Sequence, residues 1–217
     1  MKNLKTITAL FAALSMMFVM SANATTLSFT EIVDDGGPDL SSQLSAEVSA
    51  ITDGALFTFT NDVGFDSSIT SVFFDVGTAD IASVDFSAAD SSATGVNFKP
   101  ITNPNLPEGN TISFDADFGG TKDGSNADGV DAAGEYAGFI VLFGASGFDY
   151  ADLIADILSG SFRTGLHLTS IALEPDDEGG LDGSDGYVNV VPLPAAAWLF
   201  GTALFGFFAA SRRKKIS

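Results

Sequence analysis

The chain has 217 residues, and its 9 basic and 28 acidic side chains give a formal net charge of −19 at pH 7. A surface this acidic repels the phosphates of nucleic acids and of anionic lipids, which excludes nucleic-acid binding. The chain has no cysteine and a single histidine. Thiol catalysis, iron–sulfur clusters and cysteine-ligated zinc are therefore excluded, and a zinc or triad enzyme is difficult to assemble.

The first 24 residues have the pattern of a secretory signal peptide. Lys2 and Lys5 give a positive start, and residues 7–20 form an apolar stretch. The predicted cleavage site comprises Ala22, Ala24 and Thr25, with Thr25 as the new N-terminus. An uncleaved anchor is the alternative, which the small residues at the cleavage site disfavour.

Residues 25–173 predict one β-rich domain that lies outside the cytoplasm. Short runs rich in Phe, Val, Ile and Thr alternate with clusters of Asp, Asn, Gly and Ser, as in an all-β fold. We expect a β-sandwich or jelly-roll-like domain whose phenylalanines fill the space between two sheets. The expected strands include residues 25–32, 55–61, 69–76, 81–86, 111–115, 138–143 and 162–173.

One helix is predicted at residues 148–158, where apolar side chains recur at helical spacing. Asp149 and Asp152 lie near its start, where carboxylates complement the helix dipole, and Gly160 is a suitable terminator. The predicted apolar stripe comprises Tyr150, Leu153, Ile154, Ile157 and Leu158.

Residues 124–135 are the best candidate for a cation site. Calcium is held by oxygen ligands from a curled loop, and this segment partly matches such a loop. Gly124 departs from the pattern, which requires Asp at the first position, so a solvated polar loop is the alternative. The candidate calcium ligands are Asn126, Asp128, Asp131 and Glu135.

We predict no enzymatic activity and no catalytic residue. The sequence contains no nucleophile elbow, zinc-protease motif, phosphate loop or dinucleotide fingerprint. His167, which lies in a predicted strand opposite Leu166 and Leu168, is expected at an exposed or rim position. A hydrolase that uses paired carboxylates stays a further alternative, but this sequence cannot nominate the pair.

The last part of the chain has three segments in order. Residues 174–190 are acidic and rich in glycine, and predict a flexible linker. A short motif, Val191, Pro192, Leu193 and Pro194, opens an uncharged run of 20 residues that ends at Ala210. As a helix, this run is long enough to cross a bilayer of about 30 Å, and basic residues after it favour the cytoplasmic side. The predicted anchor includes Trp198, Phe200, Gly201 and Gly206, and the basic stop comprises Arg212, Arg213, Lys214 and Lys215.

Residues 191–217 resemble the PEP-CTERM sorting signal in its VPLPA form. The resemblance rests on Val-Pro-Leu-Pro-Ala, Trp198-Leu-Phe-Gly, the apolar run and the basic cluster, in the family's order. It implies an envelope protein inserted by its tail and processed by an exosortase-like enzyme. The Pro-Glu-Pro form has Glu where this chain has Leu193, which leaves the processing enzyme open. A plain C-terminal anchor is the alternative, although it does not account for the two prolines.

The sequence therefore predicts an exported protein of the cell surface or extracellular matrix, held in the inner membrane at least transiently, with a structural or interaction role. The alternative is a calcium- or carbohydrate-binding, lectin-like surface module. The expected partners are the membrane, the processing enzyme and, for the alternative, extracellular polysaccharide. Residues 25–173 are also similar to a recurrent type of domain found ahead of such tails, which supplies no activity.

Overall fold

The computed structural model describes residues 24–33, 38–62, 64–87, 92–172 and 183–190. Most of the predicted signal peptide and the whole predicted sorting signal lie outside these ranges. Within them, no helix is both long enough and apolar enough to cross a membrane.

The described residues form ten strands, one α-helix and two short 3-10 helices. The strands are β1 (Thr25–Glu31), β2 (Leu44–Ile51), β3 (Gly54–Asn61), β4 (Ser68–Asp75), β5 (Ile81–Asp85), β6 (Phe98–Pro100), β7 (Phe118–Lys122), β8 (Tyr136–Phe143), β9 (Arg163–Ile171) and β10 (Gly183–Asn189). The helices are η1 (Gly109–Ile112), η2 (Asn126–Asp128) and α2 (Tyr150–Ser159).

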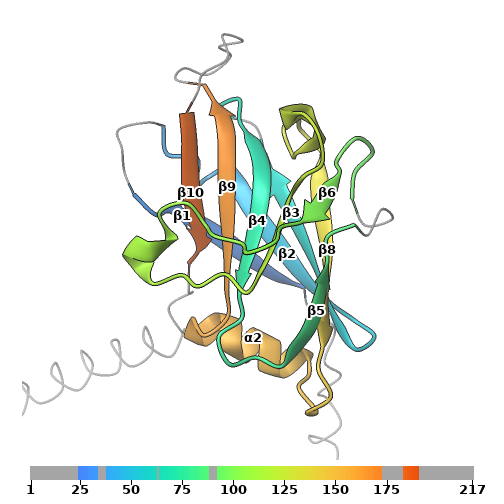
Figure 1. Ribbon diagram of the computed structural model, residues 1–217. Helices are drawn as coiled ribbons and strands as arrows, with labels where there is room; N and C mark the ends of the chain where they lie inside the picture. Colours follow the sequence, from blue (N-terminus) through green and yellow to red (C-terminus); the bar gives the residue numbers. More distant parts are fainter. Residues whose placement is uncertain (1–23, 34–37, 63, 88–91, 173–182, 191–217) are drawn as a thin grey trace, which may run out of the picture.

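All ten strands belong to one antiparallel sheet, in the order β5-β8-β3-β2-β1-β10-β9-β4-β7-β6. The sheet curls until its two halves face each other, in a nearly barrel-like arrangement (Figure 1). Strand β1 belongs to both halves, because Thr25–Ser28 pair with β2 and Phe29–Glu31 pair with β10. The short end strands β5 and β6 leave an open seam on the opposite side.

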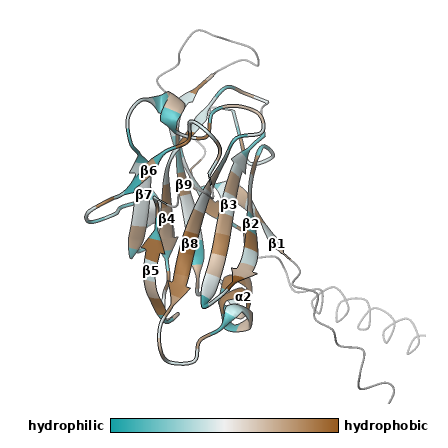
Figure 2. Cartoon of the chain, turned by 90° about the vertical axis from the view of Figure 1, so that its right-hand side faces the viewer, coloured by the Kyte–Doolittle hydropathy of each residue, from teal (hydrophilic) through white to brown (hydrophobic). Residues whose placement is uncertain are grey.

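The core lies between the two halves and is built largely from phenylalanine. Phe57 and Phe59 of β3 face Phe74 of β4, with ring centroids 5.3 and 6.2 Å apart. Along β3 these buried rings alternate with half-buried Leu56, Thr58 and Thr60, and the alternation is visible as bands of hydropathy (Figure 2). The predicted all-β class, with phenylalanine as the main core residue, is confirmed.

A long loop, residues 101–117, covers the outer face of β4 and β9. Leu106 and Phe114 pack on Phe73 of β4, so β4 is buried along its whole length. Gly165 of β9 permits this contact, because a Cβ there would lie 2.6 Å from Leu106. The prediction of a strand at residues 111–115 is wrong: η1 and a left-handed Ser113 occupy this segment, since its apolar side chains pack on β4 and β9.

The prediction of a flexible linker at residues 174–190 is wrong for the second half of this segment. Residues Gly183–Asn189 form β10, which pairs with β1 on one side and β9 on the other. Its Tyr187 is fully buried, and the Tyr187 hydroxyl accepts a hydrogen bond from the Leu40 backbone N–H at 3.2 Å. Burial raises the pKa of Tyr187 far above its usual value. This strand therefore belongs to the folded domain and lies near the middle of the sheet.

The predicted helix is confirmed as α2. Asp149 accepts hydrogen bonds from the backbone N–H groups of Ala151 and Asp152, and Asp152 bonds back to the Asp149 N–H, which forms a capping box. Gly160 ends the helix in the left-handed conformation. Leu153 and Ile157 are buried in the core, whereas Leu158, predicted on the same stripe, is exposed.

Candidate functional site

The open seam between β5 and β6 is filled by two phenylalanines. Phe86, directly after β5, and Phe98 of β6 both contact Phe139 of β8, with ring centroids 5.1 and 5.2 Å apart. The Phe86 ring lies directly over Gly120 of β7, where a Cβ would come within 2.2 Å of the ring. Among the residues that the structure describes, β5 and β6 are not paired with each other, and these contacts join the two halves of the sheet there.

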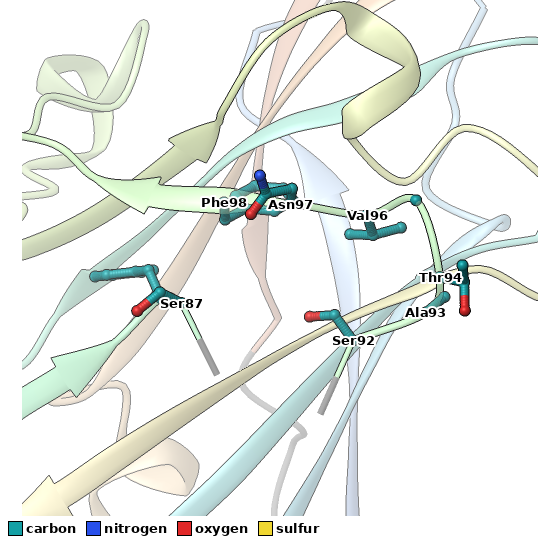
Figure 3. Close-up of a pocket in the computed structure, with 9 residues that line it drawn as sticks. Ser87, Ser92, Ala93, Thr94, Val96, Asn97 and Phe98 are labelled. Carbon is teal, nitrogen blue, oxygen red and sulfur yellow. The ribbon is translucent and has the colours of Figure 1, made fainter. Parts of the chain in front are cut away.

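A hollow of about 210 Å³ lies over this seam. Figure 3 shows Ser87 on one side of it, Ser92, Ala93 and Thr94 on the other, and Val96, Asn97 and Phe98 between them. Its floor is aromatic, because Phe86 and Phe98 are buried, and its walls carry hydroxyl and amide groups.

The walls of the hollow are fixed by local hydrogen bonds. The Ser87 hydroxyl donates to the Asp85 carboxylate at 2.9 Å, and the Ser92 hydroxyl accepts from the Gly138 N–H at 3.1 Å. The Asn97 backbone joins the hollow to the neighbouring acidic loop. Its N–H donates to the Asp128 carbonyl and its carbonyl accepts from the Asp123 N–H, both at 2.9 Å.

This neighbouring loop is the segment predicted to bind calcium, but its side chains are turned to local partners. One carboxylate oxygen of Asp128 accepts from both the N–H and the hydroxyl of Ser125, which caps η2. One carboxylate oxygen of Glu135 accepts from the N–H groups of Asp131 and Ala132. Asn126 points elsewhere: its amide donates to the Ser170 hydroxyl at 2.6 Å.

Asp131 is the electrostatically perturbed member of this loop. Partial burial raises the pKa of its carboxyl group, and the hydrogen bond and negative charge of Glu135 and the charge of Asp128 raise it further. The loop therefore brings three carboxylates near one another. Even so, among the residues that the structure describes, no group of three or more His, Asp or Glu side chains is arranged to hold a metal ion. The four predicted ligands do not converge as a calcium loop requires.

His167 lies in the middle of the sheet, which differs from the predicted exposed or rim position. It occupies β9, opposite Ser71 of β4 and Gly186 of β10, and is half-buried. Burial lowers its pKa below the usual 6.5.

The predicted targeting residues are largely outside the described ranges. Ala24 and Thr25 are described, and Thr25 opens β1, so cleavage between them would leave this strand whole. The members that fall outside are Ala22, Val191, Pro192, Leu193, Pro194, Trp198, Phe200, Gly201, Gly206, Arg212, Arg213, Lys214 and Lys215.

Sequence reasoning did not find the hollow. Ser87, Ser92, Thr94 and Asn97 belong to a segment that reads as a polar loop, and only the packing of Phe86 and Phe98 against Phe139 reveals that it encloses space. No protein-family model matches this chain, and neither a curated protein nor a solved structure matches it.

Proposed function

We propose that this chain is an exported protein of the cell surface or extracellular matrix, delivered by its signal peptide and held in the membrane, at least transiently, by its C-terminal tail. Its β domain has a structural or interaction role and no catalytic one. The tail is a sorting signal that an exosortase-like enzyme processes near Val191–Pro194.

One structural observation carries this proposal. Strand β10 completes the sheet at Asn189, and the Val190 N–H still donates to the Ser28 carbonyl at 2.9 Å. The proline motif begins at the very next residue. The last described strand thus ends just before the proline motif, which supports a boundary between the β domain and a separate targeting segment at residues 191–217.

The proline motif has a physical role in this proposal. Proline lacks a backbone donor and disfavours helix at the residue before it, so Pro192 and Pro194 keep residues 191–194 extended ahead of the apolar run. In this proposal, the extended segment at the outer membrane face is what the processing enzyme binds.

The test is the intact mass and cellular location of the mature protein. We expect a chain that begins at Thr25, lacks the apolar run and is found at the surface or in the medium. Replacing both Pro192 and Pro194 with alanine should leave insertion intact and abolish processing, whereas the control Pro38→Ala should be processed normally. Normal processing of the double variant would exclude the sorting signal, and a wild-type chain that ends at Ser217 in the inner membrane would indicate a plain anchor.

A second candidate function is carbohydrate binding, with or without calcium. The observation that favours it is the hollow, whose serine, threonine and asparagine groups adjoin the acidic loop through Asn97 and Asp128. A glycan array and calorimetry with calcium test this candidate. Asn97→Ala should weaken any glycan binding, and the absence of binding to glycans and to calcium would exclude it.

For the fold we propose a jelly-roll-like sandwich. Consecutive strands change halves of the sheet from β3 to β4, from β4 to β5, from β5 to β6, from β7 to β8 and from β8 to β9. This repeated crossing is the connectivity of a jelly roll, and it supports that class over a simple meander.

A further inference from the structure

Both ends of the folded unit leave from the end of the sheet that α2 covers. Thr25 pairs with Val48, and the Val48 carbonyl accepts a hydrogen bond from the Tyr150 hydroxyl of α2 at 2.8 Å. Val190 bonds to Ser28, a few residues along the same strand β1. Figure 1 shows α2 at one end of the molecule, with β6 and the surrounding loops toward the other.

The chain is fixed up to the residue before the proline motif. The Asn189 side-chain oxygen accepts from the buried Thr164 N–H at 2.6 Å, which ties the end of β10 to the start of β9. Only the proline motif, residues 191–194, then separates the sheet from the rest of the uncharged run, residues 195–210. Four extended residues span at most about 14 Å, so the tether between sheet and anchor is short.

We propose that the α2 end of the sheet faces the membrane and that the end carrying the hollow faces away from it. The proposal rests on the membrane anchoring proposed above, and adds the direction in which the anchored domain is presented. Strands of eight residues are about 26 Å long, so the acidic loop, which pairs through Val130 with Ile69 near the far end of β4, stands well away from the lipid.

The charge of α2 decides how this end meets the lipid. Asp149 and Asp152 are exposed and Asp156 is half-buried, and the helix carries no basic residue. Anionic headgroups repel such a surface, so the domain stands on its short tether and α2 does not enter the bilayer.

The absence of cysteine allows a direct test by single-cysteine labelling. Ala155 on α2 and Ala127 on η2 are both exposed alanines, at opposite ends of the sheet, and form a matched pair. Each variant, Ala155→Cys or Ala127→Cys, is prepared as the full chain, labelled with a donor dye and reconstituted into phosphatidylcholine–phosphatidylglycerol vesicles that carry an acceptor dye on their headgroups. Energy transfer should be clearly stronger from position 155 than from position 127.

Equal transfer, or stronger transfer from position 127, in protein that floats with the vesicles would overturn the orientation and leave the anchoring proposal standing. Protein that does not float with the vesicles would overturn both. If either variant unfolds, judged by its circular dichroism, Ala151→Cys and Ala133→Cys at exposed positions of the same two ends replace them.

A linker control separates the tether from other causes of orientation. A Gly/Ser insertion of roughly 12 residues between Val190 and Val191 adds a root-mean-square reach of about 20 Å. We expect this insertion to reduce the difference in transfer between positions 155 and 127. An unchanged difference would contradict the proposal that the short tether sets the direction.

Discussion

Arg163 is the residue that holds the covering loop on the sheet. Its guanidinium forms an ion pair with Asp75 and donates to the carbonyls of Ile112 and Ser113 in the loop. It also lies over the Phe114 ring, 5.1 Å from the centroid. The Asp75 carboxylate accepts in addition from the Asp115 N–H, so this one pair joins β4, β9 and the loop.

Arg163→Met should therefore destabilise the domain by about 3 kcal/mol, because the largely buried Asp75 carboxylate would lose its cation. The chain offers a matched control in Lys99, which pairs with Asp123 while both side chains are about half exposed. Lys99→Met should change the free energy of unfolding by less than about 0.5 kcal/mol. Chemical denaturation of both variants measures the two changes, and equal losses would show that the Arg163 pair has no special role.

His167 should make the stability of the domain depend on pH. Because burial lowers its pKa in the folded state, the folded protein binds this proton less readily than the unfolded chain. Its contribution to stability is then fully present above the unfolded pKa of about 6.5 and is lost as the pH falls below that value.

The measurement is the free energy of unfolding of wild type and His167→Gln at about pH 7.5 and at about pH 5.5. Wild type should lose more stability than the variant over this range, since glutamine does not titrate. Carboxylates titrate in both proteins, so the difference between the two isolates the histidine. A parallel loss in both would contradict the assignment.

At the scale of elements, β10 sets the C-terminal boundary of the folded domain. It fills the gap between β1 and β9, and its Tyr187 side chain is fully buried. A variant that ends at Val190 should fold and unfold cooperatively. One that ends at Leu173, the boundary expected from the sequence, should not, because two neighbouring strands lose their partner and the core loses a large ring. Thermal melts followed by circular dichroism distinguish the two, and cooperative unfolding of the shorter variant would contradict the role of β10.

Strand β3 is predicted from its side-chain alternation, because Phe57 and Phe59 alternate with threonines. The helix is predicted from its apolar spacing together with Asp149, Asp152 and Gly160. The sequence does not predict strand β10, because its first four residues, Gly-Ser-Asp-Gly, have poor strand propensity. Pairing with β1 and β9 overrides that propensity. Strand β1 is distant from β10 in the sequence, and β9 is separated from it by an acidic segment.

The candidate site was harder to predict than the fold for two physical reasons. The hollow depends on Phe86, Phe98 and Phe139 meeting across the seam, which is a tertiary contact that no local spacing encodes. The acidic loop is the segment that the sequence favours as a calcium site, but Asp128 and Glu135 accept hydrogen bonds from nearby backbone N–H groups. Local capping of this kind competes with metal binding, and sequence spacing does not distinguish the two.

At the scale of the whole molecule, charge opposes folding. Between Thr25 and Val190 the sequence has 28 acidic residues and three bases, a balance of −25. Of the three bases, Lys99 and Arg163 already pair with Asp123 and Asp75, and the Lys122 ammonium donates to the Gly124 carbonyl. The remaining carboxylates repel one another, and folding brings them closer together than they are in the unfolded chain.

Screening should therefore raise the melting temperature of a variant comprising residues 25–190. Raising sodium chloride from about 0.02 M to about 0.5 M shortens the Debye length from about 20 Å to about 4 Å. At this domain size, each kcal/mol recovered raises the melting temperature by about 2–4 °C. A melting temperature that does not rise with salt would contradict the repulsion argument.

Calcium chloride at matched ionic strength should produce the same increase in melting temperature if the cation only screens. A larger increase that is lost in Asp131→Asn would require a calcium site assembled from the acidic loop.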